Sequence, residues 1–314
     1  MTNRALVTGG AGFIGSHLCD SLLRNGWDVT VLDSLITGRQ CNIQHLMGRG
    51  DFHFVRGDVT DADLIGKLAA QADKVFHLAA MVSVPLSVEQ PEECWRVNVQ
   101  AFGSLLCALR ERKTPLAYAS SAAVYGSRSE GLRREEEPPM PLSPYGESKA
   151  INEIQAATAS CEWGVPTVGF RFFNVYGPRQ SSRGAYASVI PKFCSALVTG
   201  RTPVIYGDGG QTRDFISVHD IVEIVQRTPP ATAGTLVYNV ATGHSVTVAE
   251  TLQLIAQHWK KPIQPDYKPE RPGDIRLSAA DTLKLQSVLK DYRFQPLSGG
   301  IAETLRWYAE HPED

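Results

Sequence analysis

The feature that most constrains the fold is a glycine-rich loop between a short apolar run and a helix-like run. The run Ala5–Thr8 is followed by GGAGFIG at residues 9–15, which fits both G-x-G-x-x-G and G-x-x-G-x-x-G. Ile14, Leu18 and Leu22 then recur at the spacing of one helix face. Such glycines permit a tight turn and let backbone N–H groups approach a pyrophosphate at the helix N-terminus. The arrangement therefore predicts a dinucleotide-binding strand–loop–helix unit.

An acidic residue stands where the second strand is expected to end. Asp33 follows Gly15 by 18 residues. A carboxylate in this place accepts hydrogen bonds from a ribose 2′-hydroxyl and repels a 2′-phosphate. The spacing thus favours NAD over NADP. The alternative, a glycine cluster without a ligand and a solvent-facing Asp33, stays open at this point.

Short apolar runs alternate with helical patterns through the first half of the chain. The expected strands are Ala5–Thr8, Val29–Leu32, Phe52–Val55, Lys74–Leu78, Leu116–Ser120 and Thr167–Phe170. This alternation predicts an α/β fold with a Rossmann-type, doubly wound parallel sheet.

The residue composition and the hydrophobic pattern of the sequence change after about Asn174. Glycine and proline become frequent, and helix periodicity returns only near the end, at Ile301, Leu305 and Tyr308. We expect a smaller C-terminal α/β lobe there. The Pro-rich, charged stretch Arg133–Pro141 is expected to be a solvated connection.

Composition excludes several classes of function. The 314 residues allow about two domains, and 31 basic against 33 acidic residues give a net charge of −2. That balance offers no electrostatic reason to expect a nucleic acid or an anionic membrane as partner. The six cysteines are scattered, which predicts free thiols and no metal site. Because the chain enters a strand-like run at once, we expect no signal peptide and a cytoplasmic protein.

A Tyr-x-x-x-Lys pair follows a plausible helix start. Ser143 can cap the helix and Pro144 suits its first position, so Tyr145 and Lys149 share one face. A free tyrosine has a pKa of about 10. The Lys149 ammonium and a nicotinamide cation would both lower it, which suits a base at neutral pH. The pair also arises by chance on helices, but Ser121, just upstream, offers a hydroxyl for the same substrate oxygen.

Ordered motifs extend over nearly the whole chain. They are TGGAGFIGSHL (8–18), GD (57–58), HLAA (77–80), Asn98, SSAAVYG (120–126), YGESK (145–149), RFFNVYGPRQ (171–180), SVIPKF (188–193), YGDGGQTRDFISVHD (206–220), NVATG (239–243) and RPGD (271–274). With them the chain resembles the extended short-chain dehydrogenase/reductase family and, within it, the UDP-hexose 4-epimerases.

The resemblance implies a role for each matching residue. The catalytic trio would be Ser121, Tyr145 and Lys149. Tightly bound NAD would contact Gly9, Gly12, Phe13, Ile14, Gly15, Asp33, Ser34, Gly38, Asp58, Val59, Leu78, Ala79, Ala80, Asn98, Ser120, Tyr145, Lys149 and Phe172. A UDP-sugar would contact Ser83, Ser121, Tyr145, Asn174, Val189, Lys192, Tyr206, Arg213, Arg271, Asp274 and Ser278.

The resemblance also implies a domain organisation. Residues 1–174 would form the NAD-binding Rossmann domain, with returning segments near 215–241. Residues 175–314 would mainly bind the nucleotide sugar. Two helices, near Pro91–Arg112 and Pro144–Trp163, would build a homodimer.

Two alanines bear on the reaction. Ala122 and Ala123 stand where related sugar-nucleotide 4,6-dehydratases carry an Asp-Glu pair and UDP-glucuronate decarboxylases keep a Glu. Without that acid–base pair, elimination lacks its catalyst. The prediction is therefore epimerisation at C4 through a transient 4-keto sugar. A dehydratase, a net reductase and a non-enzymatic NAD-binding regulator remain the alternatives.

One position bears on the sugar. Ser278 stands where epimerases that exclude N-acetyl sugars have a bulky Tyr, so the pocket has room for an acetamido group. We therefore expect UDP-GlcNAc/UDP-GalNAc interconversion, with UDP-Glc/UDP-Gal also possible. Many UDP-glucuronate 4-epimerases carry an Arg in the segment that reads Ser83–Leu86 here. Arg179 or Arg183 could replace it, so this alternative stays open.

Overall fold

The computed structural model describes residues 2–127, 131–183, 187–231, 236–270 and 275–312. The chain forms two compact units. Unit 1 comprises the residues up to Gly126 together with 137–171 and 222–238, and unit 2 comprises 127–136, 172–221 and the residues from Asn239 onward. Which unit binds the cofactor and which the substrate stays a prediction.

A seven-stranded sheet forms the centre of unit 1, in the order β10-β6-β5-β4-β1-β2-β3. Its strands are β1 (Arg4–Thr8), β2 (Asp28–Asp33), β3 (Phe52–Arg56), β4 (Lys74–His77), β5 (Leu116–Ser121), β6 (Thr167–Phe172) and β10 (Val237–Val240). The pairings among β1 to β5 are parallel. All six expected strands are present, and the predicted fold class is confirmed.

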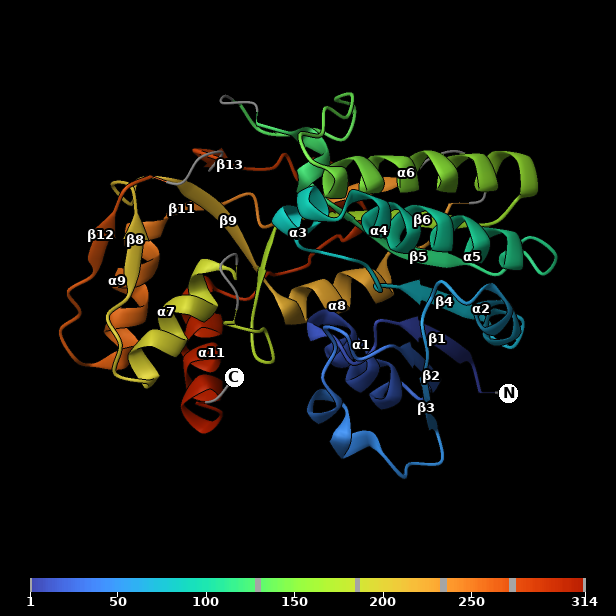
Figure 1. The fold of residues 1–314 in the computed structure, drawn as a ribbon, viewed down its shortest axis with the longest axis horizontal. Coiled ribbons are helices and arrows are strands. Elements are labelled where there is room, and N and C mark those ends of the chain that lie inside the picture. The colour runs from blue at the N-terminus through green and yellow to red at the C-terminus, as the bar shows by residue number, and fades with distance from the viewer. Residues whose placement is uncertain (1, 128–130, 184–186, 232–235, 271–274, 313–314) are drawn as a thin grey trace. The chain divides into compact units, whose positions relative to one another are not determined.

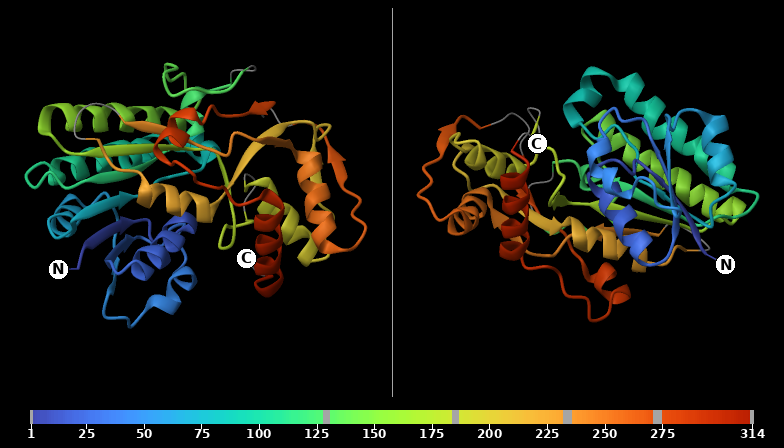
Figure 2. Two further views of the ribbon diagram at one scale, coloured as in Figure 1. Left: turned by 180° about the vertical axis from the view of Figure 1, so that it is seen from behind. Right: turned by 90° about the horizontal axis from the view of Figure 1, so that it is seen from below.

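Helices cover both faces of this sheet. They are α1 (Phe13–Arg24), α2 (Ala62–Ala69), α3 (Val84–Glu89), α4 (Pro91–Trp95), the π-helix η3 (Arg96–Gln100), α5 (Ala101–Leu109) and α6 (Pro144–Trp163), with short 3₁₀ turns η1 (Gln40–Asn42), η2 (Gln44–Leu46) and η4 (Ala122–Tyr125). Helices α5 and α6 lie side by side on one face, and α1 packs on β1 and β2 from the other (Figures 1 and 2). The core on the α5 side includes Leu6, Phe102, Leu105 and Tyr118.

The start of α6 forms as the sequence predicts. The Ser143 Oγ atom accepts a hydrogen bond from the Gly146 N–H at 3.1 Å, and Pro144 takes the first helical position. Gly164 ends the helix in a left-handed conformation, at φ 68°. The helix is thereby fixed at both ends.

Unit 2 contains two small sheets and a helical layer. Its strands are β7 (Asn174–Tyr176), β8 (Val204–Tyr206), β9 (Thr212–Ser217), β11 (Ser245–Thr247), β12 (Asp266–Lys268) and β13 (Leu277–Ser278), and its helices are α7 (Val189–Val198), α9 (Val248–Trp259), α10 (Leu283–Val288) and α11 (Leu297–Glu310). Strand β9 pairs with β7, β11 and β13. Helices α7, α9 and α11 enclose the core of the unit, as Figure 1 shows. Helix α8 (Val218–Arg227) contains the boundary between the units.

The expectation for the stretch that begins at Arg133 is wrong for its first residue. Arg133 is buried, its N–H donates to the Ala279 carbonyl at 3.0 Å, and its carbonyl accepts from the Asp281 N–H at 2.9 Å. A strand-like bridge within unit 2 therefore replaces the expected solvated connection. These partners lie far along the chain, so no local pattern signals them.

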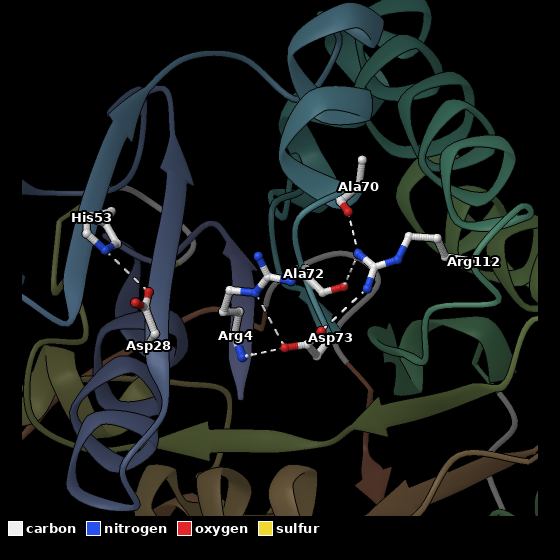
Figure 3. A network of polar contacts seen from close by, with 7 residues as sticks. All are labelled: Arg4, Asp28, His53, Ala70, Ala72, Asp73 and Arg112. Carbon is white, nitrogen blue, oxygen red and sulfur yellow. Dashed lines mark hydrogen bonds and ion pairs between the residues drawn. The ribbon is translucent and has the colours of Figure 1, made fainter. Parts of the chain in front are cut away.

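The amino-terminal edge of the unit 1 sheet carries a network of exposed polar contacts (Figure 3). The Arg4 N–H donates to Asp73 Oδ2 at 2.9 Å, and the Arg112 guanidinium bonds the carbonyls of Ala70 and Ala72 beside it. His53 and Asp28 form a separate pair at 3.3 Å. These contacts hold the ends of the loops on this edge together.

Two further expectations concern chemistry and location. All six cysteines are free thiols, as predicted. No helix among the described residues combines the length and the apolarity that crossing a membrane requires.

Candidate functional site

The glycine loop leads directly into α1. A Cβ atom at Gly15 would collide with the carbonyl oxygen of Gly9, so only glycine permits this approach of the helix to the loop. No side chain caps α1 at Gly12, and the first turn has no acidic residue. The first-turn N–H groups, including those of Phe13 and Ile14, are therefore oriented to bind an anion. This end of α1 suits the pyrophosphate of a dinucleotide.

Asp33 lies buried at the end of β2, beside the loop. Its Oδ2 accepts the Ala11 N–H at 2.9 Å and its Oδ1 accepts the Leu35 N–H at 2.8 Å. Each carboxylate oxygen keeps a second lone pair. A Cβ at Gly38 would lie 2.6 Å from Oδ1, so a glycine here keeps that side of the carboxylate accessible. The arrangement fits the ribose hydroxyls of NAD.

The residues after β3 and β4 adjoin the same edge of the sheet. Asp58 binds the Thr60 N–H at 2.9 Å and the Thr60 hydroxyl at 2.8 Å, which orders the turn after β3. In η3, Asn98 holds the backbone of Met81, since its Oδ1 accepts the N–H at 2.8 Å and its Nδ2 donates to the carbonyl at 3.1 Å. Asn98 therefore positions the segment after β4, which contains the predicted cofactor contacts Ala79 and Ala80.

His77 ends β4 and is buried against Phe102. Its Nδ1 lies 2.9 Å from the Thr8 hydroxyl. Burial, with a smaller effect of the Lys149 charge, lowers the pKa of His77 to about 3. The ring is therefore a neutral packing group at physiological pH.

The catalytic candidates meet where β5 approaches α6. The Ser121 side chain acts on the Tyr145 hydroxyl in the direction that lowers the Tyr145 pKa. The Lys149 Nζ donates to the Ala119 carbonyl at 3.0 Å and lies 6.0 Å from the centroid of the Tyr145 ring. The structure thus brings the three side chains of the trio together.

The pKa values in the trio differ from the expectation. Burial raises the pKa of Tyr145, although its hydrogen bond with Ser121 opposes the rise. Burial also lowers the pKa of Lys149, to about 8. The pKa of Tyr145 is therefore raised in the cofactor-free protein, and not lowered as predicted, because burial has the largest effect on it. A further positive charge near the phenol is needed for Tyr145 to act as a base, and the nicotinamide of NAD would supply it.

A pocket of about 240 Å³ lies within unit 2. It is lined by Asn174, Ala187, Ser188, Val189, Lys192, Phe193, Val204, Tyr206, Gln211, Arg213, Phe215 and Val248. Five of the predicted substrate residues are in this set: Asn174, Val189, Lys192, Tyr206 and Arg213. Two cationic side chains and an aromatic ring suit the phosphates and base of a nucleotide.

Ser278 lies near this pocket. Its Oγ is 3.2 Å from the Asn174 Nδ2, which also donates to the Asp214 carbonyl at 3.2 Å. The Arg213 Nη1 donates to the Ile275 carbonyl at 2.6 Å, which holds the chain just before β13. A pocket residue and the predicted sugar-selecting residue are therefore in direct contact.

Other predicted residues have different surroundings. The Ser83 hydroxyl caps α3 by accepting the Leu86 N–H at 3.3 Å. Phe172 is buried at the end of β6, Val59 is buried after β3, and Ser34 directly follows β2. Arg271 and Asp274 lie outside the described residues.

Sequence reasoning missed some residues of interest. Gln211 lines the pocket, and its Oε1 is buried without a hydrogen-bond partner among the described residues. Its place in the motif YGDGGQTRDF was the available signal. Glu153 and Arg171 form a buried ion pair at 2.7 Å next to the trio, and Glu153 follows Lys149 by one helical turn.

The parallel sheet, the uncapped glycine-loop helix and the Ser–Tyr–Lys trio define a short-chain dehydrogenase/reductase. Within that class, residues 5–241 match the NAD dependent epimerase/dehydratase family. The chain belongs to this family. It is accordingly a NAD-dependent enzyme, as predicted from the sequence.

Known proteins resemble the chain over almost its whole length. A UDP-glucose 4-epimerase of Mycolicibacterium smegmatis is 37% identical, with 97% of this chain and 98% of the relative covered. The solved UDP-N-acetylglucosamine 4-epimerase from Methanobrevibacter ruminantium, in complex with UDP-N-acetylmuramic acid, has a TM-score of 0.92 at 35% identity and covers 99% and 100% of the two chains. A UDP-glucuronic acid 4-epimerase from Bacillus cereus, solved with UDP-glucuronic acid and NAD, has a TM-score of 0.89 at 29% identity and covers 98% and 99%.

Proposed function

We propose that this enzyme interconverts UDP-hexoses that differ in configuration at C4. The observation that carries the proposal is that three side chains come together: Ser121 acts on Tyr145 to lower its pKa, and the Nζ of Lys149, one helical turn along α6, lies 6.0 Å from the centroid of the Tyr145 ring. Ala122 and Ala123 follow directly and supply no proton-transferring group. The site is thus equipped for oxidation and its reversal at one carbon, while elimination lacks an acid–base pair.

The mechanism assigns each residue a step. When bound, NAD supplies the two-electron acceptor and donor for the hydride of C4. Tyr145 takes the proton of the sugar 4-hydroxyl and later returns it. Ser121 holds the same oxygen by a hydrogen bond, and Lys149 contributes positive charge and a donor for the nicotinamide ribose. The 4-keto sugar would turn over between the two half-reactions, so that the hydride would return to the opposite face of C4 while Tyr145 returns the proton to the 4-oxygen.

We also propose a division of roles between the units. Gly12, Gly15 and Asp33 in unit 1 would hold the cofactor, and the pocket of unit 2 would hold the UDP group through Lys192 and Arg213. The relatives solved with UDP-sugars support this assignment.

For the sugar, we propose UDP-GlcNAc and UDP-GalNAc, with UDP-Glc and UDP-Gal as further substrates. The small Ser278 side chain, in contact with Asn174, supports this choice. A UDP-glucuronate 4-epimerase is the second candidate, which the similarity to the Bacillus cereus enzyme favours.

A homodimer through the helices of residues 91–112 and through α6 is part of the proposal. Exposed apolar side chains on these helices support it: Trp95 and Ile154. The free thiols support a reducing compartment, the cytoplasm. The near-zero net charge supports the absence of nucleic-acid and membrane partners.

A substrate panel tests the reaction. The purified enzyme is incubated, without added cofactor, with UDP-Glc, UDP-GlcNAc, UDP-GlcA and their C4 epimers, and the products are followed by NMR. We expect C4 epimers without accumulation of NADH. A 4-keto-6-deoxy product would identify a dehydratase, and stoichiometric use of soluble NADH a reductase.

The substitution Ser278→Tyr tests the choice of sugar. The larger ring would fill the space meant for the acetamido group, so kcat/KM for UDP-GlcNAc should fall about 100-fold and that for UDP-Glc less than about 5-fold. Ser278→Ala is the matched control and should preserve both. Equal losses on the two sugars would overturn the pocket argument.

A further inference from the structure

The end of β5 is bound to successive turns of α6. Tyr145, Lys149 and Glu153 are spaced four residues apart and share one face of the helix. Ser121 acts on the first of them, Tyr145, by lowering its pKa, and the Ala119 carbonyl accepts a hydrogen bond from the second, Lys149, at 3.0 Å. The Ser120 hydroxyl donates to the Oε1 of the third, Glu153, at 2.5 Å. The proposed mechanism uses the first two contacts and leaves the third unexplained.

Glu153 is in turn held by Arg171 from β6. The Arg171 Nε donates to Oε1 at 2.9 Å and Nη2 donates to Oε2 at 2.7 Å, which makes the pair bidentate. The side chains are 7% and 4% exposed. Although burial opposes the charged guanidinium, the hydrogen bond and charge of Glu153 raise the pKa of Arg171. The pair is thus a fully formed ion pair in the interior of unit 1.

The pair reaches both chain segments that adjoin Ser121. Ser120, the preceding residue, is bonded to Glu153. Tyr125, at the end of the 3₁₀ turn that follows Ser121, accepts a hydrogen bond on its hydroxyl from the Arg171 Nη1 at 2.7 Å. The backbone around Ser121 is therefore fixed from both sides by one pair of charges.

Stability alone does not account for this arrangement. Two buried charges lose their hydration, and well-packed apolar side chains of similar size usually stabilise a protein as well or better. An ion pair with fixed geometry, however, sets the position of what it binds. Here it binds the strand end and the helix that carry the catalytic trio.

We propose that Glu153 and Arg171 are positioning residues, which hold the Ser121 hydroxyl against Tyr145 by fixing the end of β5 to α6. The inference deepens the proposed function and rests on it. Neither residue contacts the substrate in this account. They act only through Ser120, Tyr125 and the helix.

The test replaces both charges at once. The double variant Glu153→Met/Arg171→Met removes the ion pair without leaving an unpaired charge. The cofactor-free protein is labelled with ¹³Cζ-tyrosine, and the Tyr145 signal is assigned as the one missing in Tyr145→Phe. We expect the Tyr145 signal to move by more than its linewidth, because the Ser121 hydroxyl is no longer held next to the phenol. The other groups that face Tyr145, Lys149 and Cys94, are unchanged in the variant.

Turnover gives a second readout. The kcat for the UDP-sugar should fall about 10- to 100-fold with KM within about 2-fold, as expected for lost alignment of catalytic groups. The acid limb of the kcat profile should move to higher pH, because the Ser121 hydrogen bond no longer opposes the raised pKa of Tyr145. A loss of overall stability would shift neither the acid limb of the kcat profile nor the Tyr145 signal.

Controls separate position from stability. Leu22→Ala opens a cavity under α1, and should lower the melting temperature while leaving the Tyr145 signal in place. If the double variant does not fold, Arg171→Lys is used instead. It retains the positive charge but loses the bidentate contact with Glu153, and should move the Tyr145 signal in the same direction. A Tyr145 signal that is unchanged in the folded variant overturns the inference. The Tyr145 signal is measured without substrate, so it tests the positioning role by itself. A wild-type enzyme that lacks epimerase activity would refute the proposed function and leave that test unaffected.

Discussion

The two edges of the unit 1 sheet hold their polar groups in opposite ways. At the amino-terminal edge, Arg4, Asp73 and Arg112 form contacts that remain largely exposed (Figure 3). At the carboxyl-terminal edge, His77 and Lys149 are buried, and burial shifts the pKa values of both. Exposed ion pairs contribute little to stability, whereas buried ionisable groups reduce it. Ionisable groups that stay buried although they reduce stability indicate that the carboxyl-terminal edge of the sheet has a function. The difference between the two edges can be tested.

The largest effect is expected at Tyr145. Tyr145→Phe retains the ring and removes the hydroxyl that exchanges the proton, so kcat should fall at least about 1,000-fold. Stability should stay within about 1 kcal/mol, since the ring is retained and a single hydroxyl is removed. Steady-state kinetics and urea unfolding measure the two quantities. If Tyr145→Phe retained turnover, the carboxyl-terminal edge of the sheet would not be the catalytic site.

Lys149 should show opposite effects on activity and stability. Its pKa of about 8 lies below the ordinary lysine value of 10.5, so the unfolded state binds more protons between these pH values. The stability of the wild type therefore rises as the pH increases through this window. Lys149→Met removes the cost of burying the ammonium, and should stabilise the protein by about 2 to 3 kcal/mol at pH 7 while impairing turnover.

The gain from Lys149→Met should largely disappear near pH 10.5, where the wild-type lysine is neutral in the folded state and about half neutral in the unfolded state. Urea unfolding at pH 7 and at pH 10.5 makes the comparison. A variant less stable than the wild type at pH 7 would contradict the assignment of Lys149 as a costly buried charge.

His77 should make the same edge sensitive to acid. Its folded pKa of about 3 is lower than the ordinary histidine value of 6.5, so the unfolded state binds more protons between pH 6.5 and 3. Stability is therefore lost as the pH falls through this window. Between pH 7 and pH 4.5 the wild type should lose about 2 kcal/mol more than His77→Gln. Equal losses in the two proteins would show that the ring is not buried neutral.

Much of the fold follows from local patterns. The six strands are short apolar runs closed by polar or glycine residues, and such runs are read reliably when helices separate them. The start of α6 follows from Ser143 and Pro144, whose chemistry fixes a helix end without help from the rest of the chain. The proximity of Ser121 to Tyr145 was predictable once both were placed at one edge of the sheet.

Other features depend on long-range contacts. The direction of the Tyr145 pKa shift depends chiefly on burial, which is not visible in a spacing of four residues. Arg133 was misread because its partners follow it by more than 140 residues. The ion pair of Glu153 with Arg171 was missed because a charge on a helix is usually solvated.

The smallest effect is expected at the amino-terminal edge. The pKa of Asp73 is lowered, chiefly by the hydrogen bond from the Arg4 N–H and then by nearby charges. Asp73→Asn retains an oxygen for that N–H and loses only the charge, which solvent largely screens. Unfolding free energy should fall by at most about 0.5 kcal/mol, less in high salt, with turnover unchanged. Asp28→Asn, which breaks the pair with His53, is the matched control and should behave alike. A fall of 2 kcal/mol or more in the unfolding free energy of Asp73→Asn, or any change in its kcat, would contradict the distinction between the two edges. Disturbing the exposed network would then have as large an effect as disturbing the buried groups.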